Sequence, residues 1–341
     1  MTTPETPPLY LRDGHDDHSQ ECKDVISSLP KEPGWVSTSL PKEPGWVSTF
    51  LHQYQGFWYT TWLLPGVIDC QNHFQAQDSD ILLVTTPKSG TTWLKAILFT
   101  LLNRFSFPPA AKLHPLLTQS PHDLVPFLEI KVYNGKQVPD LSCLTPPRLF
   151  ATHLPYVSLP ESVKKSKCKI VYLCRNPKDT FVSLWHFTNR LRLKESGVNG
   201  LEEAFGKFCK GISLNGPFWE HVLGYWKESL DMPERVLFLK FEEMKEEPIM
   251  NLRRLAEFIG CSFSEEEKGG GMLLDILKLC SFDNLSNLEV NVTGKLSSGE
   301  ENKVFFRKGE VGDFGKYLTA EMIEEMDGIT EHKLHGTGLK L

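Results

Sequence analysis

The sequence predicts an α/β fold: a single domain with a central parallel sheet, flanked by helices, and a P-loop-like phosphate-binding turn. Three short β-rich runs support this prediction, each followed by polar turn residues and a helical pattern, and they occupy 81–86, 169–174 and 235–240. Strands that alternate with helices form parallel sheets through crossover connections. The chain has 341 residues, 40 % of them hydrophobic, which suffices for one large core.

The chain before the first strand divides into two parts. Pro, Asp, His and Ser dominate its beginning, so we expect residues 1–49 to form a flexible segment and 50–341 the folded domain. The segment SLPKEPGWVST at 28–38 is repeated unchanged at 39–49. So short a unit cannot build a solenoid, which favours a local duplication without a role, or an error in the gene model. We expect the second copy to hold the native packing position.

Helical patterns cover the rest of the expected sheet. They occupy 91–103, 178–193, 202–230, 242–259 and 317–334. A further strand is expected over 148–152. Residues 283–316 are rich in Asn, Ser, Gly and Lys, and we expect them to form a long loop, which in a compact domain is usually functional or disordered.

Charge and cysteine usage exclude several classes of protein. Lys and Arg number 37 against 43 Asp and Glu, which argues against a nucleic-acid partner. The eight Cys form no CxxC pair, so we expect reduced thiols and no metal site. Without a long apolar run or a signal-peptide core, we expect a cytoplasmic protein with no membrane partner.

The strongest motif is TTPKSGTTWLK at 85–95, where a strand ends and a helix begins. The free N–H groups and the dipole of a helix N-terminus favour a bound anion. The lysine precedes the glycine, so the motif departs from a Walker A loop. Gly90 permits the tight turn, and Lys88 with the hydroxyls of Thr91 and Thr92 would complete an anion cradle.

Two further segments carry positive charge. Arg175 follows the second strand directly, at the sheet edge where open α/β folds bind ligands, and Ser183 lies two helical turns further on. An Arg and a Ser side by side suit a terminal phosphate. The third segment, FFRKGEVGDF at 305–314, offers Arg307 and Lys308, and its Gly309 allows close approach of the backbone to a ligand.

Together these segments resemble the cytosolic sulfotransferase family, in particular its plant members. The resemblance runs from about residue 50 to the C-terminus. It is carried by PKSGTTWL at 87–94, ATHLP at 151–155, RNPKDTFVSLWHF at 175–187, GPFWEHVLGYW at 216–226 and RKGEVGDF at 307–314. The family passes a sulfonate group from 3′-phosphoadenylyl sulfate (PAPS) to a hydroxyl or amine of a small acceptor. The resemblance therefore implies PAPS as the co-substrate and no metal.

The resemblance also implies roles for the matching residues. The 5′-phosphosulfate of the donor belongs to the loop from Lys88 to Trp93. The 3′-phosphate belongs to Arg175, Ser183, Arg307, Lys308 and Gly309, and the adenine lies near Trp93, Phe241, Ser281 and Phe282. His153 becomes the catalytic base, which suits an imidazole that is largely neutral at cytosolic pH. Lys88 then stabilises the leaving phosphate oxygen.

Several residues depart from the family pattern. Ala151 stands where many animal members carry Lys, so Lys88 must supply more of the charge. Phe241 and Phe314 stand where Tyr and Trp are usual. The dimer segment of animal members is poorly kept over 315–324, so we expect a monomer or a weak homodimer.

The sequence predicts the acceptor less clearly than the donor. Likeness to plant members suggests a flavonoid, a hydroxyjasmonate, a brassinosteroid or another phenol or alcohol. The candidate pocket residues are Phe57, Trp58, His122, Phe127, Tyr156, Phe187, Phe218 and Trp219. Two other functions stay open at this point: a P-loop-type small-molecule kinase, and a catalytically silent protein that binds a nucleotide or a hormone.

Overall fold

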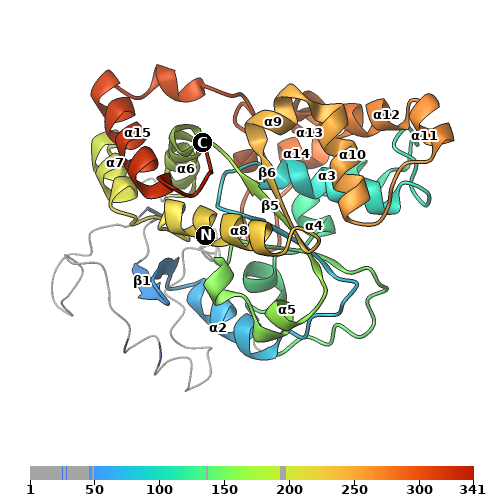
Figure 1. The fold of residues 1–341 in the computed structure, drawn as a ribbon, viewed down its shortest axis with the longest axis horizontal. Coiled ribbons are helices and arrows are strands. Elements are labelled where there is room, and N and C mark those ends of the chain that lie inside the picture. Colours follow the sequence, from blue (N-terminus) through green and yellow to red (C-terminus); the bar gives the residue numbers. More distant parts are fainter. Residues whose placement is uncertain (1–24, 26–27, 29–45, 48–49, 136, 193–196) are drawn as a thin grey trace, which may run out of the picture.

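A four-stranded parallel sheet in the order β4-β3-β5-β6 forms the centre of the molecule (Figure 1). The structure is a computed structural model that describes residues 25, 28, 46–47, 50–135, 137–192 and 197–341. The strands of the sheet are β3 (Ile81–Thr85), β4 (Leu149–Thr152), β5 (Lys169–Cys174) and β6 (Val236–Lys240). All four strands lie where the sequence predicts them. The expected flexible tail and the first repeat copy fall almost wholly outside the described residues.

The strand register brings the ends of three strands to one edge of the sheet. Val84 of β3 pairs with Thr152 of β4, and Thr85 pairs with Leu173 of β5. In parallel strands the carboxyl ends share an edge, and ligands bind there in open α/β sheets. The segments that follow β3, β4 and β5 therefore leave the sheet side by side.

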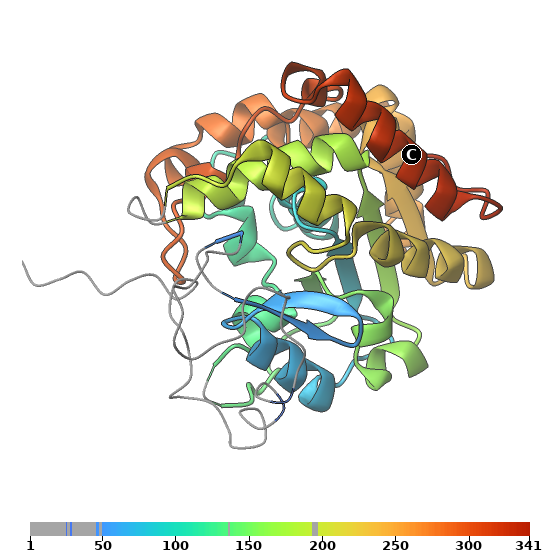
Figure 2. The same cartoon turned by 90° about the vertical axis from the view of Figure 1, so that its left-hand side faces the viewer.

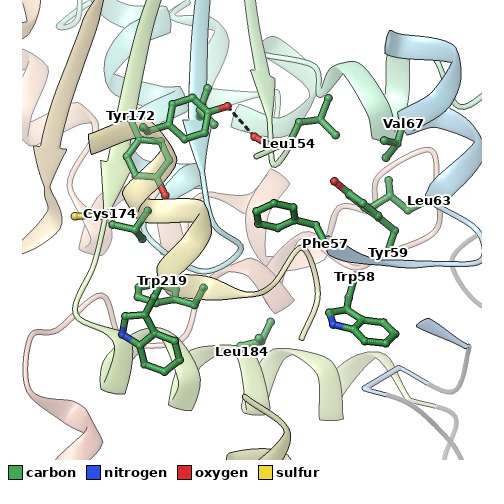
Figure 3. Packing of buried hydrophobic residues seen from close by; sticks show 14 of the residues in the cluster. Phe57, Trp58, Tyr59, Leu63, Val67, Leu154, Tyr172, Cys174, Leu184 and Trp219 are labelled. Carbon is green, nitrogen blue, oxygen red and sulfur yellow. Dashed lines mark hydrogen bonds between the residues drawn. The ribbon is translucent and has the colours of Figure 1, made fainter. Parts of the chain in front are cut away.

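Both faces of the sheet are covered, which explains the continuous apolar strands. Successive strand residues point to opposite faces. In β5, Val171 and Leu173 belong to the core cluster shared with α3 (Thr91–Asn103). Tyr172 and Cys174 belong to the second cluster, together with Phe57 and Trp219 (Figure 3).

Three helices confirm the sequence prediction closely, namely α3, α6 (Pro177–Leu191) and α15 (Ala320–Leu334). Two long patterns are each divided into two helices. Residues 202–230 form α7 (Leu201–Cys209) and α8 (Phe218–Asp231), and residues 242–259 form α9 (Phe241–Glu246) and α10 (Pro248–Phe258). Pro248 explains the second division, because proline lacks an N–H and disfavours a helical residue before it; Glu247 accordingly has ψ 64°.

The expectation of a long loop over 283–316 is wrong. This stretch holds most of α13 (Phe282–Asn287), all of α14 (Glu289–Thr293), and the 3-10 turns η6 (Asn302–Phe305) and η7 (Asp313–Lys316). Ser281 caps α13 by accepting a hydrogen bond from the Asn284 N–H at 3.1 Å. These helical turns are short, and the Asn and Ser residues at their ends obscure the apolar periodicity that predicts a helix.

A β-hairpin at the start of the described domain was not expected. It consists of β1 (Leu51–Tyr54) and β2 (Phe57–Thr60), joined at Gln55 and Gly56 with φ of 52° and 84°. Two-residue hairpins favour positive φ at both turn residues. In Figures 1 and 2 the hairpin and α2 (Leu64–His73), both blue, lie below α6, α7 and α15. The remaining short elements are η2 (Pro115–Leu117), α4 (Pro121–Leu124), η3 (Leu128–Val132), η4 (Tyr156–Ser158), α5 (Glu161–Lys165), α11 (Glu265–Gly269) and α12 (Met272–Leu279).

Trp46 and Val47, the described residues of the second repeat copy, pack into the core. Trp46 is 3 % exposed, and the indole N–H donates to the Ile212 carbonyl at 2.9 Å. The Asn199 amide in turn donates to the Trp46 carbonyl at 2.9 Å. Val47 is buried beside it. The packing position expected for the second copy is thus occupied.

Candidate active site

The loop between β3 and α3 is held in a fixed, strained shape. Gly90 has φ 103°, and a Cβ there would come within 2.8 Å of the Phe241 ring, so only glycine fits. Lys88 also has a positive φ, 70°. The hydroxyls of Thr86 and Ser89 lie 2.6 Å apart and tie the loop together. The first N–H groups of α3 have no partner within the helix, which makes this end a site for an anion.

Four cations surround this loop. The ammonium of Lys88 lies 4.2 Å from the centre of the Phe187 ring. Burial and the positive charges of Arg190, Arg175 and Arg307 together lower the pKa of Lys88 to about 7. The Lys88 amine therefore lies in a strongly positive environment that disfavours its own protonation. A bound polyanion would relieve this repulsion.

The two arginines have donors to spare. Arg175 is 4 % exposed; one of its Nη atoms donates to the Glu310 carbonyl at 2.6 Å, and its guanidinium lies 4.7 Å from the Phe241 ring centre. Arg307 pairs with Asp313. Among the described residues, the Nε atoms of both arginines are buried without a hydrogen-bond partner. Buried donors without a partner are costly, which fits a ligand rich in oxygen acceptors.

Three aromatic rings lie at the same end of the site. Trp93 and Phe241 meet edge to face, with ring centres 5.5 Å apart. Phe282 packs against Gly309, where a Cβ would come within 2.6 Å of the ring. Flat apolar surfaces of this kind suit a nucleotide base.

His153 follows β4 and is fixed on both sides. Its backbone N–H donates to the Glu129 carboxylate at 2.7 Å, and its Nδ1 lies 2.7 Å from the Thr85 carbonyl oxygen. A carbonyl only accepts, so Nδ1 carries the proton and Nε2 keeps its lone pair. Burial lowers the pKa of His153 to about 3, and the charges of Lys95, His221 and Lys88 contribute. The imidazole is therefore neutral at pH 7.

A second amine is buried behind the wall of the site. Lys95 of α3 is fully buried; its Nζ lies 3.2 Å from Nδ1 of His122 and 3.3 Å from the centre of the Phe127 ring. Burial holds the pKa of Lys95 well below its usual range. Sequence reasoning passed over this residue, because a lysine in a helix is normally solvated.

A cavity of about 440 Å³ joins these parts. Most of the residues expected at the site line it, namely Lys88, Gly90, Thr91, Thr92, Trp93, His153, Arg175, Ser183, Phe241, Ser281, Phe282, Arg307 and Gly309. Ser89 and Lys308 are not among the lining residues. The Ser89 hydroxyl is turned to Thr86, and the Lys308 ammonium lies 2.8 Å from the Asp313 carboxylate.

The expected acceptor residues divide sharply. His122, Phe127 and Phe187 line the cavity. The remaining five do not, and for them the expectation is corrected. Figure 3 shows Phe57, Trp58 and Trp219 packed in the core, where Phe218 is also buried. Tyr156 packs on Tyr225, with ring centres 5.6 Å apart.

The structure adds lining residues that the sequence did not reveal. They include Asn215, whose buried amide nitrogen has no partner among the described residues, together with Lys245, Ser298 and Glu300. Arg190 lowers the pKa of Lys88 through its positive charge. It follows Ser183 by seven residues on α6, and residues two turns apart share a helix face, so its place near the site could have been predicted from the sequence. The other residues reach the cavity through tertiary packing alone.

A strained loop at a parallel-sheet edge, excess cations and a group of aromatic rings define a nucleotide-binding protein. The family model described as the sulfotransferase domain matches residues 78–338. The chain belongs to this family and is a PAPS-dependent sulfotransferase with a small acceptor substrate. This assignment displaces both the kinase and the silent binding protein.

Plant relatives match over nearly the whole chain. Cytosolic sulfotransferase 12 of Arabidopsis thaliana is 49 % identical over 341 residues, which is 100 % of this chain and 99 % of that protein. Cytosolic sulfotransferase 15 of the same plant is 50 % identical over 323 residues, 94 % of this chain and 87 % of that protein.

Solved structures confirm the fold. A putative steroid sulphotransferase of Arabidopsis thaliana superposes with a TM-score of 0.75 at 44 % identity, covering 98 % of this chain and 100 % of that one. Mouse sulfotransferase SULT7A1, complexed with PAP, gives a TM-score of 0.66 at 27 % identity and covers 84 % and 95 %. In the described part of this chain, no helix is long and apolar enough to cross a membrane, and no three His, Cys, Asp or Glu side chains gather as metal ligands.

Proposed function

We propose that this enzyme transfers the sulfonate group of PAPS to a hydroxyl of a small acceptor by in-line displacement, with His153 as the general base. The observation that carries the proposal is the hydrogen bond from His153 Nδ1 to the Thr85 carbonyl, 2.7 Å long. It fixes a neutral imidazole whose Nε2 can accept a proton. The loop that bears Lys88 begins just after the same threonine, so Thr85 helps to fix the position of both His153 and Lys88.

The donor fits the residues on charge and shape. Its phosphosulfate end would lie in the loop of Lys88, Thr91 and Thr92, where no described carboxylate forms an ion pair with Lys88. Its 3′-phosphate would take the free donors of Arg175 and Arg307. Its adenine would lie among Trp93, Phe241 and Phe282, with Ser281 beside them. Ser183 and Gly309 line the same cavity, while Ser89 and Lys308 would act by holding the loops.

His153 and Lys88 then have separate roles in the reaction. His153 takes the proton of the acceptor hydroxyl, whose pKa in a phenol is ~10, as that oxygen bonds to sulfur. The bond from sulfur to the phosphate oxygen breaks, and its electron pair stays on that oxygen. Lys88 stabilises this new charge. Ala151 provides no second ammonium group. Stabilisation of the charge on the leaving oxygen therefore depends strongly on Lys88.

The acceptor class, the cellular location and the oligomeric state are proposed from the similarity to known sulfotransferases. Flavonoids, hydroxyjasmonates and brassinosteroids are the acceptor classes we propose, and the names of the relatives support action in the cytoplasm. We also propose a monomer or weak homodimer, because the animal dimer segment is poorly kept over 315–324.

The test compares His153→Ala with His73→Ala, an exposed histidine at the end of α2. With labelled PAPS and an ordinary phenol, the loss of the base should lower kcat by ~10²–10⁴-fold, while affinity for the donor stays close to wild type. A nitrophenol, already partly ionised at neutral pH, should lose less. If both phenols slow by the same factor, His153 only orients the acceptor.

A further inference from the structure

One carboxyl group faces a cavity whose other charged lining residues, among those described, are cationic. Glu300 is the only acidic side chain among the described residues that line it. It is 8 % exposed, and no described Lys, Arg or His forms an ion pair with it. A buried carboxyl group without a cation is unusual unless it meets a ligand or a polar partner.

The segment that carries Glu300 is a closed and ordered turn. Lys295 and Glu301 form an antiparallel bridge, and the Leu296 N–H donates to the Glu300 carbonyl at 2.9 Å. The Asn302 amide donates to the Val290 carbonyl at 2.8 Å and ties the turn to α14. Ser298 donates its hydroxyl to the Glu300 carboxylate. The carboxyl group is therefore held in place rather than free to swing into solvent.

The turn is joined in the chain to an aromatic ring beside the residues that we assign to the acceptor. It leads directly into η6, whose Phe305 ring centre lies 4.2 Å from that of His122 and 5.7 Å from that of Phe187. Lys88 Nζ lies 5.8 Å from the same Phe305 ring, which marks the boundary with the donor loop. The basic residues of the donor end, Arg175 and Arg307, form no ion pair with Glu300 among the described residues.

We infer that Glu300 is a specificity residue: its carboxyl group hydrogen-bonds a hydroxyl or amino group at the end of the acceptor away from the reacting oxygen, and it disfavours acceptors that carry a carboxylate there. The inference rests on the proposed function and narrows its acceptor classes: flavonoids and brassinosteroids, which lack a carboxylate, are favoured over hydroxyjasmonates, which carry one. A carboxylate brought beside Glu300 must either meet like charge or force one group to take up a proton, and both cost free energy. Burial already raises the pKa of Glu300, so little solvent is at hand to screen the pair.

The test uses phenols that carry an alkyl tether of graded length, ending in a carboxylate or in its methyl ester. For the tether that reaches Glu300, wild type should prefer the ester by about tenfold or more in kcat/KM. Glu300→Gln keeps the shape but removes the charge, and it should reduce this preference severalfold. Glu301→Gln is the matched control, because Glu301 pairs with Lys303 at 2.8 Å on the surface.

The same acceptors are also titrated by calorimetry into enzyme loaded with adenosine 3′,5′-bisphosphate (PAP), so that binding is read without turnover. Equal ester-to-acid ratios in wild type and Glu300→Gln at every tether length would overturn the inference, as would an equal change in Glu301→Gln. Failure to sulfonate 4-nitrophenol would instead overturn the proposed function, and the binding ratios would still decide the role of Glu300.

Discussion

Donor binding should take up a proton at Lys88. The pKa of this amine is about 7 in the free protein, because it is buried and because Arg190, Arg175 and Arg307 repel its charge. An anionic ligand beside it favours the ammonium and raises this pKa. A group half-protonated at pH 7 is only ~10 % protonated at pH 8, so on binding of PAP the Lys88 amine should take up ~0.5 proton at pH 7 and ~0.9 at pH 8.

The sign of the pH dependence follows from this uptake. Between the free pKa and the higher pKa of the complex, the affinity for PAP should fall by up to about tenfold for each unit of rising pH. Phosphate groups titrate near pH ~6 and would release protons, so the measurement belongs above pH ~7.5, where they are already ionised. His153, with its pKa of about 3, stays neutral throughout.

The assay is isothermal titration calorimetry of PAP in buffers that differ in ionisation enthalpy, since the slope of the heat against that enthalpy counts the protons. Lys88→Arg is the matched control, because a guanidinium keeps the charge and does not titrate in this range. The uptake should vanish in this variant. No uptake in wild type at pH 8, or the same uptake in both proteins, would refute the account of Lys88.

Three other outcomes follow from the geometry. PAP should raise the melting temperature much more than AMP, and equal shifts would contradict a role for Arg175 and Arg307 in reading the 3′-phosphate. Trp46→Ala should cost ~3–5 kcal/mol of unfolding free energy in a urea titration, whereas Trp35→Ala, in the other repeat copy, should cost little; equal losses would show that both copies pack. Gly90→Ala should lower both PAP affinity and melting temperature, because φ is 103° and the added Cβ meets Phe241 at 2.8 Å; wild-type values of both would refute the fit.

The sheet could be predicted because its strands are short, apolar and separated by helices. Each strand is buried on both faces, so the sequence shows an unbroken run, as in 169–174. The division of 242–259 was also readable from Pro248. The helical turns within 283–316 were not, because their ends are built from the same Asn and Ser residues that favour loops.

The donor end of the site was accessible to sequence reasoning, and the acceptor end was not. Lys88, Gly90 and Thr91 are neighbours in the chain, so a local motif displays their chemistry. The acceptor wall is assembled from segments far apart in sequence. Aromatic residues such as Phe57 and Trp219 have the right composition for it but point into the core. Glu300 carries no local sign that its carboxyl group is buried.

The site is organised at a cost to the free protein. An overall acidic chain gathers Lys88, Arg175, Arg190 and Arg307 around one loop, and burial together with their repulsion keeps the pKa of Lys88 near neutrality. Repulsion of this kind destabilises the empty fold and is relieved when an anionic ligand enters. The donor should therefore stabilise the protein through a difference in charge between the two states, in addition to its direct contacts. Of these cations, Lys88 is the one that we place at the leaving oxygen, where catalysis needs its charge.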